Sequence, residues 1–168
     1  MTSSQVRRFT LDAMLLGVAM MLSYLEAVLP LSLIIALPGA KLGLCNVAVM
    51  LCFYAVSPGD ALIVSLMRIS LTSLLFGNIS SFGFSLFGGL LAYAGMWLGK
   101  ALGKRVSYYG ISVLCAALHN IGQCIAGSMI LGSISVFSYL PLLLLFGIFF
   151  GFITGAIITP IVRLFKNA

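Results

Sequence analysis

Long apolar runs, separated by short breaks rich in proline, glycine or charge, make up most of the chain. A helix needs about 20 mainly apolar residues to cross the hydrocarbon core of a bilayer, and most of the runs approach or exceed that length. The pattern therefore predicts an all-α integral membrane protein of six transmembrane helices. These are expected at residues 9–29, 42–56, 61–76, 82–98, 108–131 and 139–158.

The breaks between the runs define the connections. Residues 31–37 are apolar but too few to cross the membrane, and Pro38 and Gly39 then form a strong turn signal. Residues 30–41 are therefore expected to form a re-entrant or interfacial loop. Residues 57–60 form a tight turn, with Asp60 placed to cap the next helix. Four glycines within 82–98 indicate close helix packing there.

Composition supports the bilayer as the solvent. Hydrophobic residues are 62% of the chain, charged residues 7%, and the mean hydropathy is +1.22. Residues 1–168 are thus expected to form a single transmembrane domain in the cell membrane. The net charge of +6 does not indicate a nucleic-acid partner, because the basic residues gather at the ends of the apolar runs.

The positions of these basic residues predict the orientation. Cytoplasmic loops of membrane proteins carry an excess of lysine and arginine. With six crossings, the two ends of the chain and the loop between the fourth and fifth helices share one face, which predicts that both termini are cytoplasmic. The residues concerned are Arg7, Arg8, Lys100, Lys104, Arg105, Arg163 and Lys166.

Polar side chains interrupt the apolar runs, mostly in the outer half of the predicted membrane. A charge at the centre of a transmembrane helix costs roughly 2.5–3.5 kcal/mol on insertion scales, so such residues usually mark a functional site. His119 and Gln123 are four residues apart, hence on one helix face. The candidate substrate-binding residues are Glu26, Lys41, Asn46, Arg68, Asn78, His119, Asn120 and Gln123. The alternative is structural: Glu26 pairs with Lys41 or Arg68, and His119 caps a kink.

Several catalytic and cofactor signatures are missing. The sequence has no phosphate-binding G-x-x-x-x-G-K-[ST] loop and no H-E-x-x-H zinc motif. Its one histidine and three acidic residues offer neither a catalytic triad nor the carboxylates that hold Mg²⁺ for diphosphate chemistry. The four cysteines lie in apolar runs without a C-x-x-C pair. No enzyme activity, metal or cofactor is expected.

Small residues on the first helix suggest a partner surface. Ala13 and Gly17 are one turn apart, which would let another helix approach closely. Internal packing explains such a pair equally well.

Two motifs resemble a known family. The run from Pro38 to Asn46 (P-G-A-K-L-G-L-C-N) and the run from His119 to Gln123 (H-N-I-G-Q), together with Arg68, resemble the Gx transporter family. Its members are often labelled heptaprenyl diphosphate synthase component I. The resemblance covers nearly the whole chain. Ala40 and Cys45 stand where isoleucine and alanine are expected, and Gly17 stands where the first helix of the family has alanine.

The resemblance implies a fold similar to the substrate-binding S components of energy-coupling-factor (ECF) transporters. Such proteins bind a solute from outside and work with a transmembrane coupling subunit and two ATPase subunits. Small residues on their first helix contact the coupling subunit, which implies that role for Ala13 and Gly17. The synthase label fits less well, because prenyl diphosphate synthases use aspartate-rich motifs that this chain lacks.

The leading hypothesis is therefore a solute-binding membrane subunit for uptake. Its solute is expected to be anionic or ring-containing, such as a flavin, a quinone precursor or an isoprenoid precursor. The alternative is a non-catalytic membrane subunit that docks a prenyl diphosphate synthase. A proton-coupled carrier that acts alone ranks last, since no inverted repeat is evident.

Overall fold

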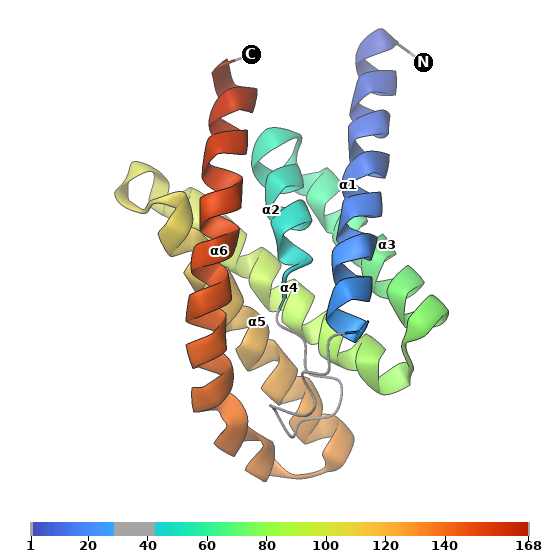
Figure 1. Cartoon of the computed structure of the whole chain (residues 1–168), viewed down its shortest axis with the longest axis vertical. Coiled ribbons are helices and arrows are strands. Elements are labelled where there is room, and N and C mark those ends of the chain that lie inside the picture. Colours follow the sequence, from blue (N-terminus) through green and yellow to red (C-terminus); the bar gives the residue numbers. More distant parts are fainter. Residues whose placement is uncertain (1, 29–42, 168) are drawn as a thin grey trace.

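The structure, a computed structural model, describes residues 2–28 and 43–167, which form a bundle of six α-helices without a strand (Figure 1). The predicted loop at residues 30–41, including Lys41, lies outside the described residues. The predicted all-α class is confirmed. The helices are α1 (Ser3–Val28), α2 (Asn46–Ala55), α3 (Pro58–Phe76), α4 (Ile79–Leu102), α5 (Tyr108–Leu131) and α6 (Leu140–Asn167).

Five segments of the described chain are long and apolar enough to cross a membrane. They are α1, α3, α4, α5 and Ile134–Phe165, which joins α6 to the 3-10 helix before it. α2 differs, because its 10 residues span about 15 Å, roughly half of a typical hydrocarbon core. The second predicted helix therefore exists but is shorter than expected, and it begins inside the bundle.

Helix caps differ in one respect from the prediction. The Ser57 side chain, not Asp60, caps α3 by accepting a hydrogen bond of 3.1 Å from the Asp60 backbone N–H. The Asp60 carboxylate is instead bound by Arg8 of α1. Serine is the better cap here because its hydroxyl precedes the first turn, whereas Asp60 already lies within it.

α6 continues to Asn167, past the predicted end at residue 158 and through Pro160. A proline inside a helix removes one backbone hydrogen bond. Ile158 and Val162, on either side of the proline, are both fully buried in the bundle. Packing of this face holds the helix together across the missing hydrogen bond. The proline in the sequence cannot reveal this, because the packing involves other helices.

Glycines set the close packing of α4, α5 and α6, the helices with the most extensive mutual contacts. A methyl group at Gly122 of α5 would lie 2.5 Å from the Phe87 carbonyl oxygen of α4. Methyl groups at Gly151 and Gly155 of α6 would lie 2.8 Å from backbone atoms of α5. The predicted close contact of the glycine-rich fourth helix is therefore confirmed, and α6 uses glycine in the same way.

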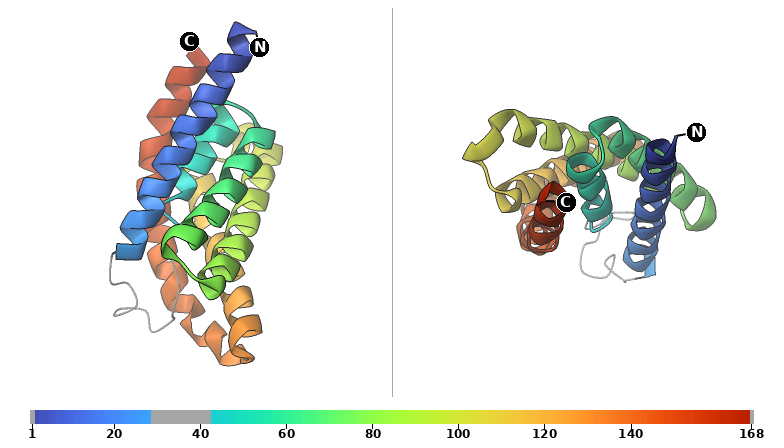
Figure 2. Two further views of the ribbon diagram at one scale, coloured as in Figure 1. Left: turned by 90° about the vertical axis from the view of Figure 1, so that its right-hand side faces the viewer. Right: turned by 90° about the horizontal axis from the view of Figure 1, so that it is seen from above.

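α1 lies on the outside of the bundle against α2 and α3, as two views show (Figures 1 and 2). Its buried residues are Ala19, Ser23 and Glu26, which fall on one helix face. Both ends of the chain lie at the same end of the bundle, at the top of Figure 1. An even number of passes through the bundle requires this arrangement, while its cytoplasmic placement stays a prediction.

Candidate functional site

A carboxylate lies at the point where α2 begins. Glu26, near the end of α1, is 4% exposed, and its Oε1 accepts a hydrogen bond from the backbone N–H of Leu44. Leu44 stands two residues before the first residue of α2. The amino-terminal end of a helix carries a partial positive charge. The short helix therefore presents its positive end toward the only carboxylate of this interior region among the described residues.

A buried arginine of α3 contacts α1 one helical turn before Glu26. Arg68 of α3 is 1% exposed, and its Nη1 donates a hydrogen bond of 3.3 Å to the Ser23 hydroxyl. Ser23 precedes Glu26 by three residues on the same helix face. Within the described part of the chain, the Nε and Nη2 of Arg68 have no hydrogen-bond partner. The guanidinium thus lies beside the face of α1 that carries Ser23 and Glu26, and most of its N–H donors make no hydrogen bond within the described residues.

A histidine and two amides lie on the other side of α4. The His119 ring Nε2 and the Gln123 side-chain amide nitrogen are 2.8 Å apart, as their predicted common helix face requires. A methyl group at Gly43 would lie 3.2 Å from His119 Cδ2 and 3.0 Å from the Asn46 amide nitrogen. His119 and Asn46 therefore meet across Gly43, which adopts a positive φ of 80° just before α2.

Two adjacent glycines of α4 allow close approach, one to the histidine and the other to the arginine. A methyl group at Gly88 would lie 2.7 Å from the His119 ring, and one at Gly89 would lie 3.7 Å from Arg68 Nη2. The first distance is too short for any side chain at Gly88, whereas the second is an ordinary van der Waals contact. We call the set Glu26, Asn46, Arg68, His119 and Gln123 the polar cluster; each member is buried.

Other predicted site residues lie outside the polar cluster. Asn120 donates a hydrogen bond of 2.6 Å to the Leu143 carbonyl oxygen and so joins α5 to α6. Asn78 is exposed and caps α4 by accepting a hydrogen bond of 2.8 Å from the Ser81 N–H. Ala13 and Gly17 are exposed on α1. These four residues therefore lie apart from the cluster, and the side chains of Asn120 and Asn78 have clear structural roles.

Within the described residues, the space beside Asn46 of the polar cluster is small. A cavity of about 10 Å³, lined in part by Gly43, Asn46 and Ser112, adjoins the cluster. This volume is no larger than one water molecule requires.

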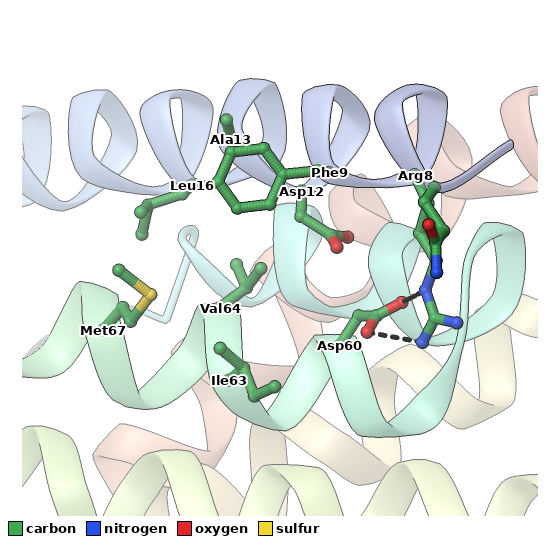
Figure 3. Close-up of a pocket in the computed structure, with 10 residues that line it drawn as sticks. Arg8, Phe9, Asp12, Ala13, Leu16, Asp60, Ile63, Val64 and Met67 are labelled. Carbon is green, nitrogen blue, oxygen red and sulfur yellow. Dashed lines mark hydrogen bonds and ion pairs between the residues drawn. The ribbon is translucent and has the colours of Figure 1, made fainter. Parts of the chain in front are cut away.

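A second cluster, not predicted from the sequence, lies between α1 and α3 (Figure 3). Arg8 binds Asp60 through two hydrogen bonds, from Nε to Oδ2 at 2.6 Å and from Nη2 to Oδ1 at 2.7 Å. Asp12 lies one turn after Arg8 and accepts a weak hydrogen bond from the Cys52 thiol at 3.5 Å.

These groups line one end of a largely apolar groove of about 480 Å³, whose rim includes Ala13. The Arg8 side chain is 57% exposed, so solvent screens the ion pair with Asp60 and the pair adds little stability. One signal in the sequence could have indicated the cluster: Arg8 and Asp12 are four residues apart near the start of a mainly apolar helix.

Together, these features define a class. A helical bundle whose described part has five segments long and apolar enough to cross a membrane, together with a buried polar cluster, belongs to the class of multi-pass membrane proteins. The family model described as heptaprenyl diphosphate synthase component I matches residues 15–161, and the chain belongs to that family. The match spans every member of the polar cluster. Comparisons with curated proteins and with solved structures yielded no match.

Proposed function

We propose that this protein is a non-catalytic membrane subunit that binds a small solute at the polar cluster. The observation that carries the proposal is Arg68, which is 1% exposed and uses one of its nitrogens in a hydrogen bond to Ser23. The bound solute supplies the missing acceptors for this guanidinium.

The energetic argument rests on desolvation. Removing a charged group from water costs several kcal/mol even after relaxation, and acceptors must offset that cost. A guanidinium carries five N–H donors in a planar fork, which matches a carboxylate, a phosphate or a pair of carbonyl oxygens. Nε and Nη2 of Arg68 have no acceptor in the described part of the chain. An anionic or carbonyl-rich solute fits this need.

Neighbouring groups add direction to the site. Asn46, His119 and Gln123 supply amide and imidazole groups that can hydrogen-bond a heterocycle. Tyr24, the residue after Ser23 on α1, meets Phe76 edge to face with ring centroids 5.4 Å apart, and both side chains are exposed. A flavin, a quinone precursor and an isoprenoid precursor all satisfy these requirements.

Uptake of such a solute requires an energy source, which we assign to partners of the ECF type: a coupling subunit and two ATPase subunits in the cell membrane. The exposed face of α1 supports a helical partner. A methyl group at Gly17 would meet nothing within 4 Å, so the backbone there is open to another helix. In this arrangement both termini face the cytoplasm, where the ATPases reside.

The family description favours a second candidate function, a membrane subunit that docks a prenyl diphosphate synthase. In that case the exposed surfaces would bind the synthase, and the polar cluster would only stabilise the bundle. The two functions differ in what purifies with the protein.

The test is mass spectrometry of the protein purified in mild detergent, with organic extraction of any small molecule that purifies with it. We expect a stoichiometric solute in the natural protein, loss of most of it in Arg68→Met, and full retention in Arg105→Met. Arg105 is an exposed arginine outside the cluster, which makes it the matched control.

Two outcomes would contradict the proposal. Retention of the solute by a folded Arg68→Met protein would show that the guanidinium does not bind it. An empty natural protein that purifies with a prenyl diphosphate synthase would instead establish the docking function. Arg68→Met preserves side-chain volume and is therefore better suited to this test than Arg68→Ala.

A further inference from the structure

A second cavity lies at the end of the bundle that bears the termini. Its volume is about 680 Å³, within the range of small-molecule sites. The ends of α2 and α4, the start of α5 and the last part of α6 form its walls, so it is separate from both the polar cluster and the α1–α3 groove. Two cationic side chains line it, Lys100 of α4 and Arg163 of α6.

Within the described residues, these two cations have no carboxylate to neutralise them. Three acidic residues occur in the whole chain. Asp12 and Asp60 lie in the α1–α3 groove, and Glu26 lies in the polar cluster. Arg8, near the same end of the bundle, is paired with Asp60, whereas Lys100 and Arg163 form no ion pair within the described residues. The cavity therefore carries an unbalanced positive charge.

The remaining walls combine an anion-binding element with apolar surface. The amino-terminal end of α5, capped by Ser107, lines the cavity, and its partial positive charge adds to that of the two side chains. Lys100 Nζ lies 5.0 Å from the centroid of the Trp97 ring, which holds the ammonium group near the apolar surface. Val106 and Ile111 extend that surface.

We propose that this cavity binds a phosphate group attached to an apolar chain, with Lys100 and Arg163 as the phosphate contacts. Two sources share that chemistry: an anionic phospholipid of the bilayer and a free phosphate ester. The site is independent of the proposed solute function, because it uses none of the polar cluster.

The experiment uses the full-length protein in detergent and in nanodiscs. The first arm measures retention of phosphatidylglycerol against phosphatidylcholine by native mass spectrometry. The second arm measures the shift in thermal unfolding with inorganic diphosphate and with geranyl diphosphate. The test variant is Lys100→Gln/Arg163→Gln, and the matched control is Arg7→Gln/Arg105→Gln, which removes two exposed cations that do not line the cavity.

We expect the test variant to lose about tenfold or more in affinity for the phosphate ligand, because each cation that contacts an anionic headgroup contributes severalfold to binding. The affinity of the control variant should stay within about twofold of that of the natural protein. Loss of phosphatidylglycerol retention alone assigns the site to a lipid, and loss of the geranyl diphosphate shift assigns it to a free ester. Equal losses in both variants would overturn the proposal, because charge at the membrane surface would then explain the binding. Absence of all binding would overturn it as well.

Should the double variant fail to fold, Arg163→Gln alone carries the test. The Arg163 side chain is exposed, so its replacement leaves the bundle core unchanged. We expect Arg163→Gln to lower the affinity for the phosphate ligand by less than the double variant does. An unchanged affinity would show that Arg163 does not contact the ligand, contrary to the proposal.

Discussion

Arg68 combines full burial with a shortage of acceptors, a combination that is costly for stability and useful for binding. Replacement of a buried ion pair by apolar side chains of similar volume is often neutral or stabilising by about 1–4 kcal/mol. Arg68 has no ion-pair partner among the described residues, so its removal leaves no partner charge uncompensated there. We therefore expect Arg68→Met to unfold in detergent at the same temperature as the natural protein without solute, or at a higher one. Thermal unfolding followed by circular dichroism measures this.

The control for this comparison is Arg105→Met, whose exposed side chain should leave the unfolding temperature unchanged. A marked drop for Arg68→Met alone would show that the guanidinium stabilises the bundle, and would favour the structural role for the polar cluster.

Asn78 illustrates how a polar residue at a helix end differs from one inside the bundle. Its side chain caps α4, and loss of such a cap costs about 1 kcal/mol. We expect Asn78→Ala to lower the free energy of unfolding by about that amount while solute occupancy stays unchanged. Urea unfolding combined with solute quantification checks both parts.

The conservative variant Asn78→Ser keeps a capping hydroxyl and should restore most of the stability. If Asn78→Ala instead emptied the protein of solute without lowering its stability, the residue would belong to the binding site after all.

At the scale of the helices, Gly88 and Gly17 form an informative pair. A methyl group at Gly88 would lie 2.7 Å from the His119 ring, whereas one at Gly17 meets nothing within 4 Å. Both changes to alanine gain similar helix propensity, so their difference isolates packing. We expect Gly88→Ala to be less stable than Gly17→Ala by about 1–3 kcal/mol, as overpacked cores usually are.

Thermal unfolding of the two variants in the same detergent measures the difference. Equal stability would mean that α4 and α5 can separate without cost, contrary to the close packing of the two helices.

The lengths of the helices show where a pattern in the sequence is sufficient and where it fails. Apolar runs predict most of the helices because a membrane span requires a continuous apolar segment. They fail for α2, whose start inside the bundle depends on Glu26 accepting the Leu44 N–H from another helix. They also fail at Pro160, where α6 continues because Ile158 and Val162 are buried against neighbouring helices.

At the scale of the whole molecule, the structure places both chain ends on one side of the bundle. The four natural cysteines are buried, which leaves little background for thiol labelling. We expect Ser4→Cys and Ile134→Cys, both at exposed positions, to react from opposite sides of the membrane. A membrane-impermeant maleimide added to intact cells should label position 134, and position 4 should react after permeabilisation.

Labelling of both positions from outside would contradict this arrangement, in which positions 4 and 134 lie at opposite ends of the six-helix bundle. Labelling of position 4 alone in intact cells would keep the fold but reverse the predicted orientation, which rests on the basic residues near the termini.

Several properties of this protein are determined by the sequence by itself. The membrane class and the helix number follow from hydropathy, because the bilayer requires each spanning segment to be apolar along its length. The same argument identifies Glu26, Arg68 and His119 as unusual, since charged and polar groups are costly in that setting. These conclusions need no knowledge of which helices are neighbours.

Only the tertiary structure decided which polar residues meet. His119 and Asn120 are adjacent in sequence, yet one faces Gly88 of α4 and the other binds the Leu143 carbonyl of α6. The pairing of Arg8 with Asp60 likewise depends on the contact of α1 with α3. Each of these outcomes depends on helix rotation and on glycines that permit close approach, and both are properties of packing between segments distant in the chain.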